Sequence, residues 1–94
     1  MRVTLHVPGV LRALADDQRT LIFDLPPGAT VAELLAAVAA RAPGLHARAV
    51  DELGAVRRHV NVFVEDESIR QLKGTATTLR DGQEIWVIPA VSGG

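Results

Sequence analysis

The residues best suited to chemistry are the last two of the sequence, Gly93 and Gly94. Glycine has no Cβ and tolerates nearly any backbone conformation, so such a pair can pass through a narrow channel. The reactive group that the pair presents would be the carboxylate of Gly94. A carboxylate is a poor acyl donor until one oxygen becomes a leaving group, so we expect adenylation in the ATP site of a partner. The activated acyl group would then pass to sulfur or to an amine.

An apolar run precedes the glycines and reaches a proline. Residues Ile85 to Ile88 fit a strand, whereas Pro89 has a restricted φ and cannot donate to a strand ladder. We therefore expect a folded domain over residues 1–88 and a flexible tail over residues 89–94. Because terminal glycines also occur at ordinary frayed ends, the rest of the chain must decide whether this tail is functional.

Length and composition limit what the chain can be. With 94 residues, 48% of them hydrophobic, the sequence predicts one small domain without room for an elaborate enzyme cleft. The net charge of −1 gives no electrostatic reason to bind nucleic acid or an anionic membrane. There is no cysteine, so any sulfur that the protein handles must come from elsewhere. Because we find no signal sequence and no apolar run of about 20 residues, we expect a cytoplasmic protein.

Alternation of polar and apolar residues, which is typical of half-buried strands, predicts most of a sheet. It runs through the segments 2–7, 20–25, 59–64 and 84–88, with a short edge segment at 68–70. The segment between the first two strands is expected to be a loop over residues 10–19. The pattern also weakens over residues 45–58, where Leu45, Ala49 and Leu53 could form a short helical turn.

One helix has a strong signal. Thr30 and Glu33 have the spacing of a capping box, in which the threonine hydroxyl accepts from the N–H of Glu33 and the glutamate side chain returns to the N–H of Thr30. Apolar residues then recur at helical spacing until Pro43 and Gly44 end the helix. The economical packing is an α+β fold, in which a mixed sheet curls over one main helix and the first and last strands lie centrally and parallel.

The alternation also predicts an apolar patch outside the core. If Ile85 and Val87 face the helix, Trp86 and Ile88 face the other side of the sheet, where Phe63 also emerges. Exposed large apolar residues that lie close together tend to mark interfaces, and aromatic residues are favoured anchors. We therefore expect Phe63, Trp86 and Ile88 to dock a partner. The alternative is that a loop partly covers Trp86, which then only fills a gap.

Other residues with chemical potential give weaker signals. His6, His46 and His59 lack the spacing of metal ligands and are expected to be surface or strand residues. The acidic run at 65–67 could hold a cation but fits a solvated turn better. Ser92 has no oriented base beside it, so we do not expect it to act as a nucleophile. Neither a metal nor a bound cofactor is predicted.

In the order of its motifs, the chain resembles the ubiquitin-like β-grasp sulfur carriers. This family includes the small subunit of molybdopterin synthase, the thiamine-pathway sulfur carrier and the thiocarboxylate carrier of a cysteine pathway. The resemblance spans essentially all of the chain, and the terminal motif is its most specific part. The motifs lie at residues 28–35, 60–62 with 65–66, 79–84 and 88–94.

The resemblance implies a protein cosubstrate rather than an enzyme. An E1-like enzyme would use ATP to adenylate the carboxylate of Gly94, and a sulfurtransferase or another sulfide source would convert it to a thiocarboxylate. A sulfur-accepting biosynthetic enzyme would then take the sulfur. Gly94 already ends the sequence, so no trimming protease is expected. The residues expected to enter or line the partner's channel with Gly94 are Pro89, Val91, Ser92 and Gly93.

Several alternatives stay open within and beyond this resemblance. The segment 59–70 and the long connection 45–58 resemble the cysteine-pathway carrier more than the thiamine one, and a molybdopterin-type acceptor remains possible. The same activated carboxylate would also serve a ubiquitin-like protein modifier that is joined to lysines through Gly94. A third alternative is a binding module with an incidental tail.

Overall fold

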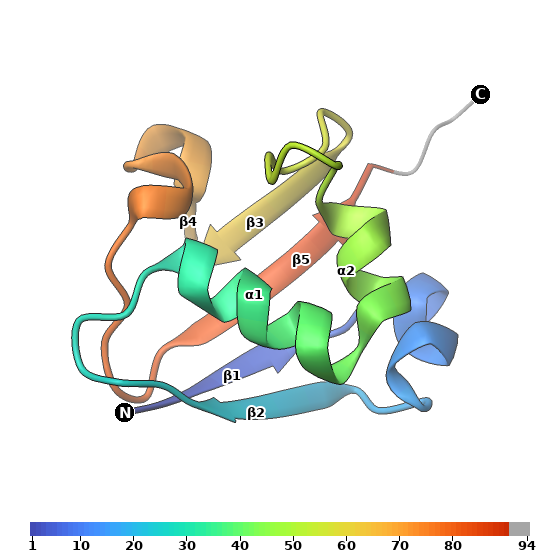
Figure 1. Cartoon of the computed structure of the whole chain (residues 1–94), viewed down its shortest axis with the longest axis horizontal. Helices are drawn as coiled ribbons and strands as arrows, with labels where there is room; N and C mark the ends of the chain where they lie inside the picture. The colour runs from blue at the N-terminus through green and yellow to red at the C-terminus, as the bar shows by residue number, and fades with distance from the viewer. Residues whose placement is uncertain (91–94) are drawn as a thin grey trace.

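A mixed five-stranded sheet with helices on one face forms the molecule, which we describe over residues 1–90 of a computed structural model (Figure 1). The strand order β2-β1-β5-β3-β4 places the first and last strands at the centre, where they run parallel. The other neighbouring strands are antiparallel, and the predicted α+β arrangement is confirmed. In chain order the elements are β1 (Arg2–His6), the 3-10 helix η1 (Gly9–Ala15), β2 (Thr20–Asp24), α1 (Val31–Arg41), α2 (Pro43–Ala49), β3 (Val60–Val64), β4 (Glu67–Ser68), the 3-10 helices η2 (Ile69–Gln71) and η3 (Gly74–Ala76), and β5 (Glu84–Pro89).

The core lies between the inner face of the sheet and α1, which crosses that face in Figure 1. The buried stripe of α1 follows the predicted helical spacing. Burial of each large aliphatic side chain stabilises the fold by about 1.5–3 kcal/mol, so this layer fixes the sheet as a rigid platform. Its helical members are Val31, Leu34, Leu35 and Val38.

The entry to α1 differs from the predicted capping box in one bond. The Thr30 Oγ1 atom accepts from the Glu33 backbone nitrogen at 3.4 Å, as expected. The glutamate carboxylate, however, accepts the Thr30 hydroxyl at 3.5 Å instead of the Thr30 N–H. A hydroxyl can donate and accept at once, so one side chain makes both bonds. The chain enters this cap along an antiparallel bridge between Thr30 and Thr78.

Two short helices lie in segments whose sequence signals are weak, one predicted as a loop over residues 10–19 and one predicted as a short helical turn within residues 45–58. The segment Gly9–Ala15 is a 3-10 helix that buries Leu11 and Ala15, which are too few apolar positions for a readable period. Pro43 ends α1 as predicted but also begins α2, because the first helical position needs no N–H donor. Leu45 and Ala49 are buried in α2, which confirms the predicted helical turn over these two residues, whereas Leu53 is 93% exposed and its inclusion was wrong.

The strand end predicted at Ile88 was also wrong. Pro89 lies in β5 opposite Val60, and the Ala90 nitrogen donates to the His59 carbonyl at 2.6 Å. In the alternating antiparallel pattern, the Pro89 nitrogen faces away from β3 and towards β1. The pairing of β1 with β5 has already ended at Trp86, so the missing N–H costs no ladder bond. The remaining predicted tail residues, 91–94, lie outside the described residues.

Candidate partner-binding site

The outer face of the sheet brings together the three residues predicted to dock a partner. Phe63 of β3 lies directly opposite Trp86 of β5, and the next outward pair joins Asn61 to Ile88. Trp86 is 40% exposed, Ile88 is 44% exposed and Phe63 is half-buried. The predicted geometry is confirmed, whereas docking itself stays a prediction.

Trp86 and Ile88 form a ridge between two hollows. A shallow hollow of about 300 Å³ lies on the β3 side, where Phe63, Glu65 and Asp66 complete its lining. A larger hollow of about 470 Å³ lies on the β1 side of the ridge. A ridge of this kind offers a partner both large apolar atoms and space for its own side chains. The larger hollow is lined by His6, Val7, Pro8, Arg12, Arg19, Thr20, Trp86, Val87 and Ile88.

The sequence did not single out His6 as a neighbour of Trp86. The two rings stack with centroids 3.7 Å apart and planes only 5° from parallel. His6 Nε2 also lies 2.5 Å from Glu84 Oε1. The alternation of β1 already indicated that His6 faces outward. The parallel pairing of β1 with β5 then sets His6 beside Trp86. His6, a strand residue, therefore covers one face of the Trp86 ring.

Charges of opposite sign lie on the two sides of the ridge. Arg12 and Arg19 line the larger hollow, whereas Glu65 and Asp66 line the smaller one. Within residues 1–90 the ion pair between permanently charged groups is Arg2 with Asp24, so Arg12, Arg19, Glu65 and Asp66 are not neutralised by such a pair. The outer face therefore combines an apolar ridge with a cationic and an anionic flank.

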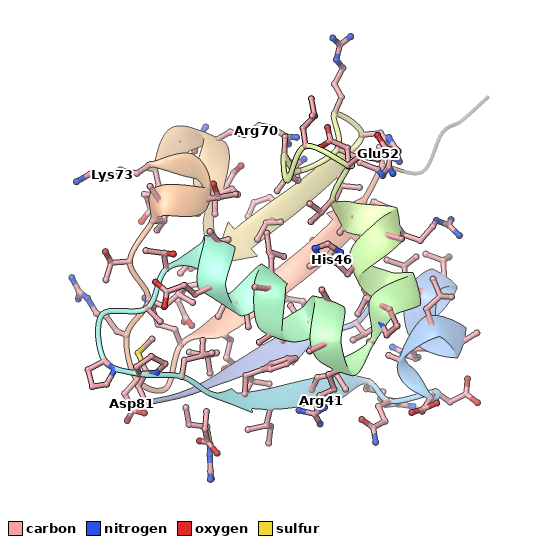
Figure 2. The ribbon with its side chains drawn as sticks, in the orientation of Figure 1. Arg41, His46, Glu52, Arg70, Lys73 and Asp81 are labelled. Carbon is pink, nitrogen blue, oxygen red and sulfur yellow. The ribbon has the colours of Figure 1, made fainter. Side chains whose placement is uncertain are left out.

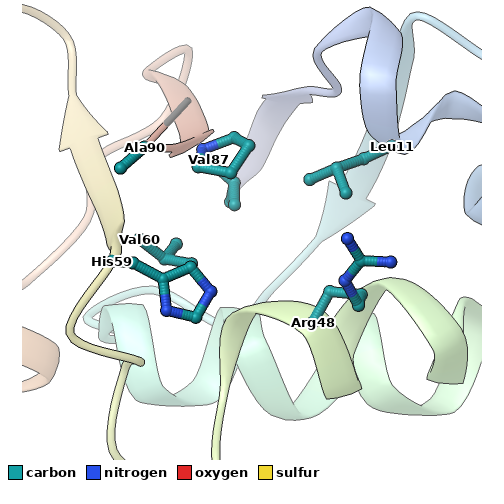
Figure 3. A pocket seen from close by; sticks show the side chains of 7 residues that line it. Leu11, Arg48, His59, Val60, Val87 and Ala90 are labelled. Atoms are coloured by element: carbon teal, nitrogen blue, oxygen red, sulfur yellow. The ribbon is translucent and has the colours of Figure 1, made fainter. Parts of the chain in front are cut away.

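The chain leaves the sheet beside a small hollow on the helix side (Figure 3). Its volume is about 280 Å³, and Arg48 of α2 and His59 enter it from opposite walls. Pro89 and Ala90 line the same hollow, and the bond from Ala90 to His59 holds this point of the chain against β3. The root of the predicted tail is thus part of the rigid body, at the same end of β5 as Ile88.

The remaining candidates are dispersed. His6 lies on the outer face, His59 precedes β3, and His46 lies on α2 at the helix side (Figure 2). The described residues contain no group of three His, Asp or Glu side chains that could hold a metal ion. Residues 65–66 form the turn into β4, which already begins at Glu67, and Glu65 Oε2 accepts from the Glu84 nitrogen at 2.5 Å. No helix within residues 1–90 is long and apolar enough to cross a bilayer.

A mixed sheet wrapped over one main helix, with an exposed apolar face on its last strand, defines a ubiquitin-like β-grasp domain. The sequence pattern of the ThiS family matches residues 5–94. The chain therefore belongs to the ThiS family, as its motifs indicated. Sulfur carriers of this type are small carrier proteins rather than catalysts.

Individual relatives agree with this assignment. The chain is 32% identical to the sulfur carrier protein CysO of Mycobacterium tuberculosis over 96 residues, with 100% of both chains covered. It is 35% identical to small archaeal modifier protein 3 of Haloferax volcanii, over 82% of this chain and 83% of that protein. Its structure matches one chain of the Amycolatopsis orientalis BexX/CysO complex with a TM-score of 0.84 and 35% identity, covering 98% of this chain and 99% of that one.

Proposed function

We propose that this protein is a sulfur carrier whose Gly94 carboxylate is adenylated, converted to a thiocarboxylate and used as a sulfide donor in biosynthesis. The observation that carries the proposal is that the ThiS family match runs through to Gly94 and therefore includes the Gly93-Gly94 pair. The likeness to CysO over the whole chain favours a cysteine-type acceptor over a molybdopterin-type one.

The chemistry follows from the weakness of a carboxylate as an acyl donor. In an E1-like partner, a Gly94 carboxylate oxygen attacks the α-phosphorus of ATP, and pyrophosphate leaves as the acyl–phosphate bond forms. Sulfide, released by a sulfurtransferase or supplied by another source, then attacks the carbonyl carbon, and AMP leaves. The resulting thiocarboxylate passes its sulfur to a biosynthetic enzyme. The chain has no cysteine of its own, so its terminus is where sulfur would be held.

The position of the apolar ridge suits this chemistry. Beyond Ala90, four residues span at most about 14 Å when fully extended. An ATP site that receives Gly94 must therefore lie close to the end of β5, where Trp86 and Ile88 are exposed. In this proposal Phe63, Trp86 and Ile88 contact the activating enzyme. The residues that enter its channel are Pro89, Val91, Ser92, Gly93 and Gly94.

The proposal is tested by reconstituting activation. The protein, an E1-like enzyme of its host and ATP are incubated with radiolabelled pyrophosphate, whose exchange into ATP reports adenylation. Sulfide is then added and the terminus is assayed for a thiocarboxylate. We expect exchange and thiocarboxylate formation with the full chain and neither with a chain that lacks Gly94. Equal exchange by both chains would contradict the proposal. The use of ATP would place these steps in the cytoplasm.

A second candidate is a protein modifier, favoured by the likeness to small archaeal modifier protein 3. Here the adenylated Gly94 would be attacked by a lysine amine instead of sulfur, and an isopeptide bond would form as AMP leaves. Immunoblots of host extracts distinguish the two functions. A modifier gives high-mass conjugates that disappear when Gly94 is deleted, whereas a dedicated sulfur carrier gives the free protein alone.

A further inference from the structure

The ring of Trp86 is held in place although it lies on an open face. It is the only tryptophan in the chain, and no core packs over its exposed side. A large side chain in such a position is normally free to change rotamer. Here the imidazole of His6 covers one face of the indole at a centroid distance of 3.7 Å, almost parallel to it. This stacking restrains the indole, because a change of its orientation would break the contact.

His6 is itself held in place by Glu84. Its Nε2 atom lies 2.5 Å from Glu84 Oε1, and its side chain is only 21% exposed. The backbone of Glu84 is held in turn by Glu65, whose nitrogen donates to the Glu84 carbonyl at 2.8 Å and whose carboxylate accepts from the Glu84 nitrogen. The imidazole that stacks on Trp86 is therefore linked through Glu84 to the β3–β4 turn.

We propose that His6 is a positioning residue, which holds the Trp86 ring in the orientation that the activating enzyme binds. The inference rests on the proposed function, because it assumes that the Trp86 ridge docks that enzyme. Its physical basis is preorganisation. A side chain that is already ordered in the free protein loses less entropy on binding, which is worth about two- to tenfold in affinity for one such side chain.

Three substitutions separate stacking from hydrogen bonding. His6→Ala removes both contacts, His6→Phe can stack on the indole but cannot bond to Glu84, and His6→Gln can bond to Glu84 but cannot stack. Since Trp86 is the only tryptophan, the decay of its fluorescence anisotropy reports the motion of this ring alone. The matched control is Thr4→Ala, which alters the same strand and the same face one outward position away from His6.

We expect a fast, large-amplitude anisotropy decay in His6→Ala and His6→Gln, and decays close to that of the unmodified protein in His6→Phe and Thr4→Ala. In the adenylation assay, His6→Ala should raise the KM for the carrier about two- to tenfold, as one disordered side chain predicts, with little change in kcat. His6→Phe should restore most of the loss. A general folding defect would not be rescued by phenylalanine.

Three results would overturn the inference, and the third of them also contradicts the proposed function. An unchanged anisotropy decay in His6→Ala would show that His6 does not hold the ring. A freed ring with an unchanged KM would show that its orientation is irrelevant to docking. If the unmodified protein is not adenylated while its Trp86 ring is rigid, the proposed function is wrong, and the docking role of His6 is overturned with it.

Discussion

Alternate residues of β5 meet two different environments. Ile85 and Val87 are 1% and 3% exposed against the helix layer, whereas Trp86 and Ile88 are 40% and 44% exposed on the outer face. All four residues are large and apolar, so hydrophobicity alone does not separate them. The difference shows that one strand both closes the core and presents apolar area that the domain leaves uncovered. If the proposed function is right, the inner pair determines stability and the outer pair determines partner binding.

Removal of Gly94 should have the largest functional effect. The shortened chain ends in a carboxylate about 3.5 Å nearer the body, which places the acyl group out of reach of the ATP site. We expect pyrophosphate exchange to be lost and the melting temperature to be unchanged, as measured on the same samples. A large drop in melting temperature would contradict the separation of a stable body from a reactive end.

Ile85→Ala should have the largest effect on stability. It empties a position that is 1% exposed, and such truncations cost about 2–5 kcal/mol of unfolding free energy. Urea unfolding of the purified variant gives this value. The KM for adenylation, measured where the variant is still folded, should stay near that of the unmodified chain. A raised KM with unchanged stability would reverse the roles assigned to the two faces.

Trp86→Ala should show the opposite pattern one residue further on. Truncation of an aromatic anchor at an interface typically costs about 2 kcal/mol or more of binding free energy, so the KM should rise at least about thirtyfold. Unfolding free energy should fall by less than in Ile85→Ala. The matched control is Ile22→Ala, since Ile22 is 48% exposed on the same face but lies on the outer strand β2. An equal rise in KM in both variants would argue against a specific docking ridge.

Thr30→Ala should have the smallest effect and only on stability. It removes the hydroxyl that accepts from the Glu33 nitrogen, and loss of such a cap costs about 0.5–2 kcal/mol. Thr78→Ala serves as the control, because it makes the same chemical change at the exposed bridge partner of Thr30. Urea unfolding should rank the two variants in that order, and neither should change the KM. An effect of Thr30→Ala on KM would link the helix layer to docking.

Sequence patterns predicted the burial of side chains correctly in the elements that pack against the core over several residues. The stripe of α1 and the alternation of β5 each extend over several residues, so the burial of Leu34 and Ile85 and the exposure of Trp86 were predictable. The 3-10 helix η1 was missed and α2 was predicted only as a short helical turn, because each contains only two buried residues. Pro89 was misread because its tolerance in β5 depends on where β1 stops pairing, which is a tertiary fact.

The candidate site was predictable to a similar extent. Phe63, Trp86 and Ile88 came from alternation along two strands whose pairing was not needed for the prediction. His6 was missed as a site residue because its role depends on the register of β1 against β5, which sets His6 beside Trp86. The turn at Glu65 likewise acquires its link to Glu84 only when the strands pair.

The most direct test of the account is the intact mass of the protein isolated from its own host under conditions that preserve thiocarboxylates. The account predicts a population heavier than the unmodified chain by the difference between sulfur and oxygen, with fragmentation placing the added mass on Gly94. The heavier population should disappear when the E1-like enzyme is deleted. A terminus found only as the carboxylate, with the mass unchanged by that deletion, would contradict the claim that Gly94 carries sulfur.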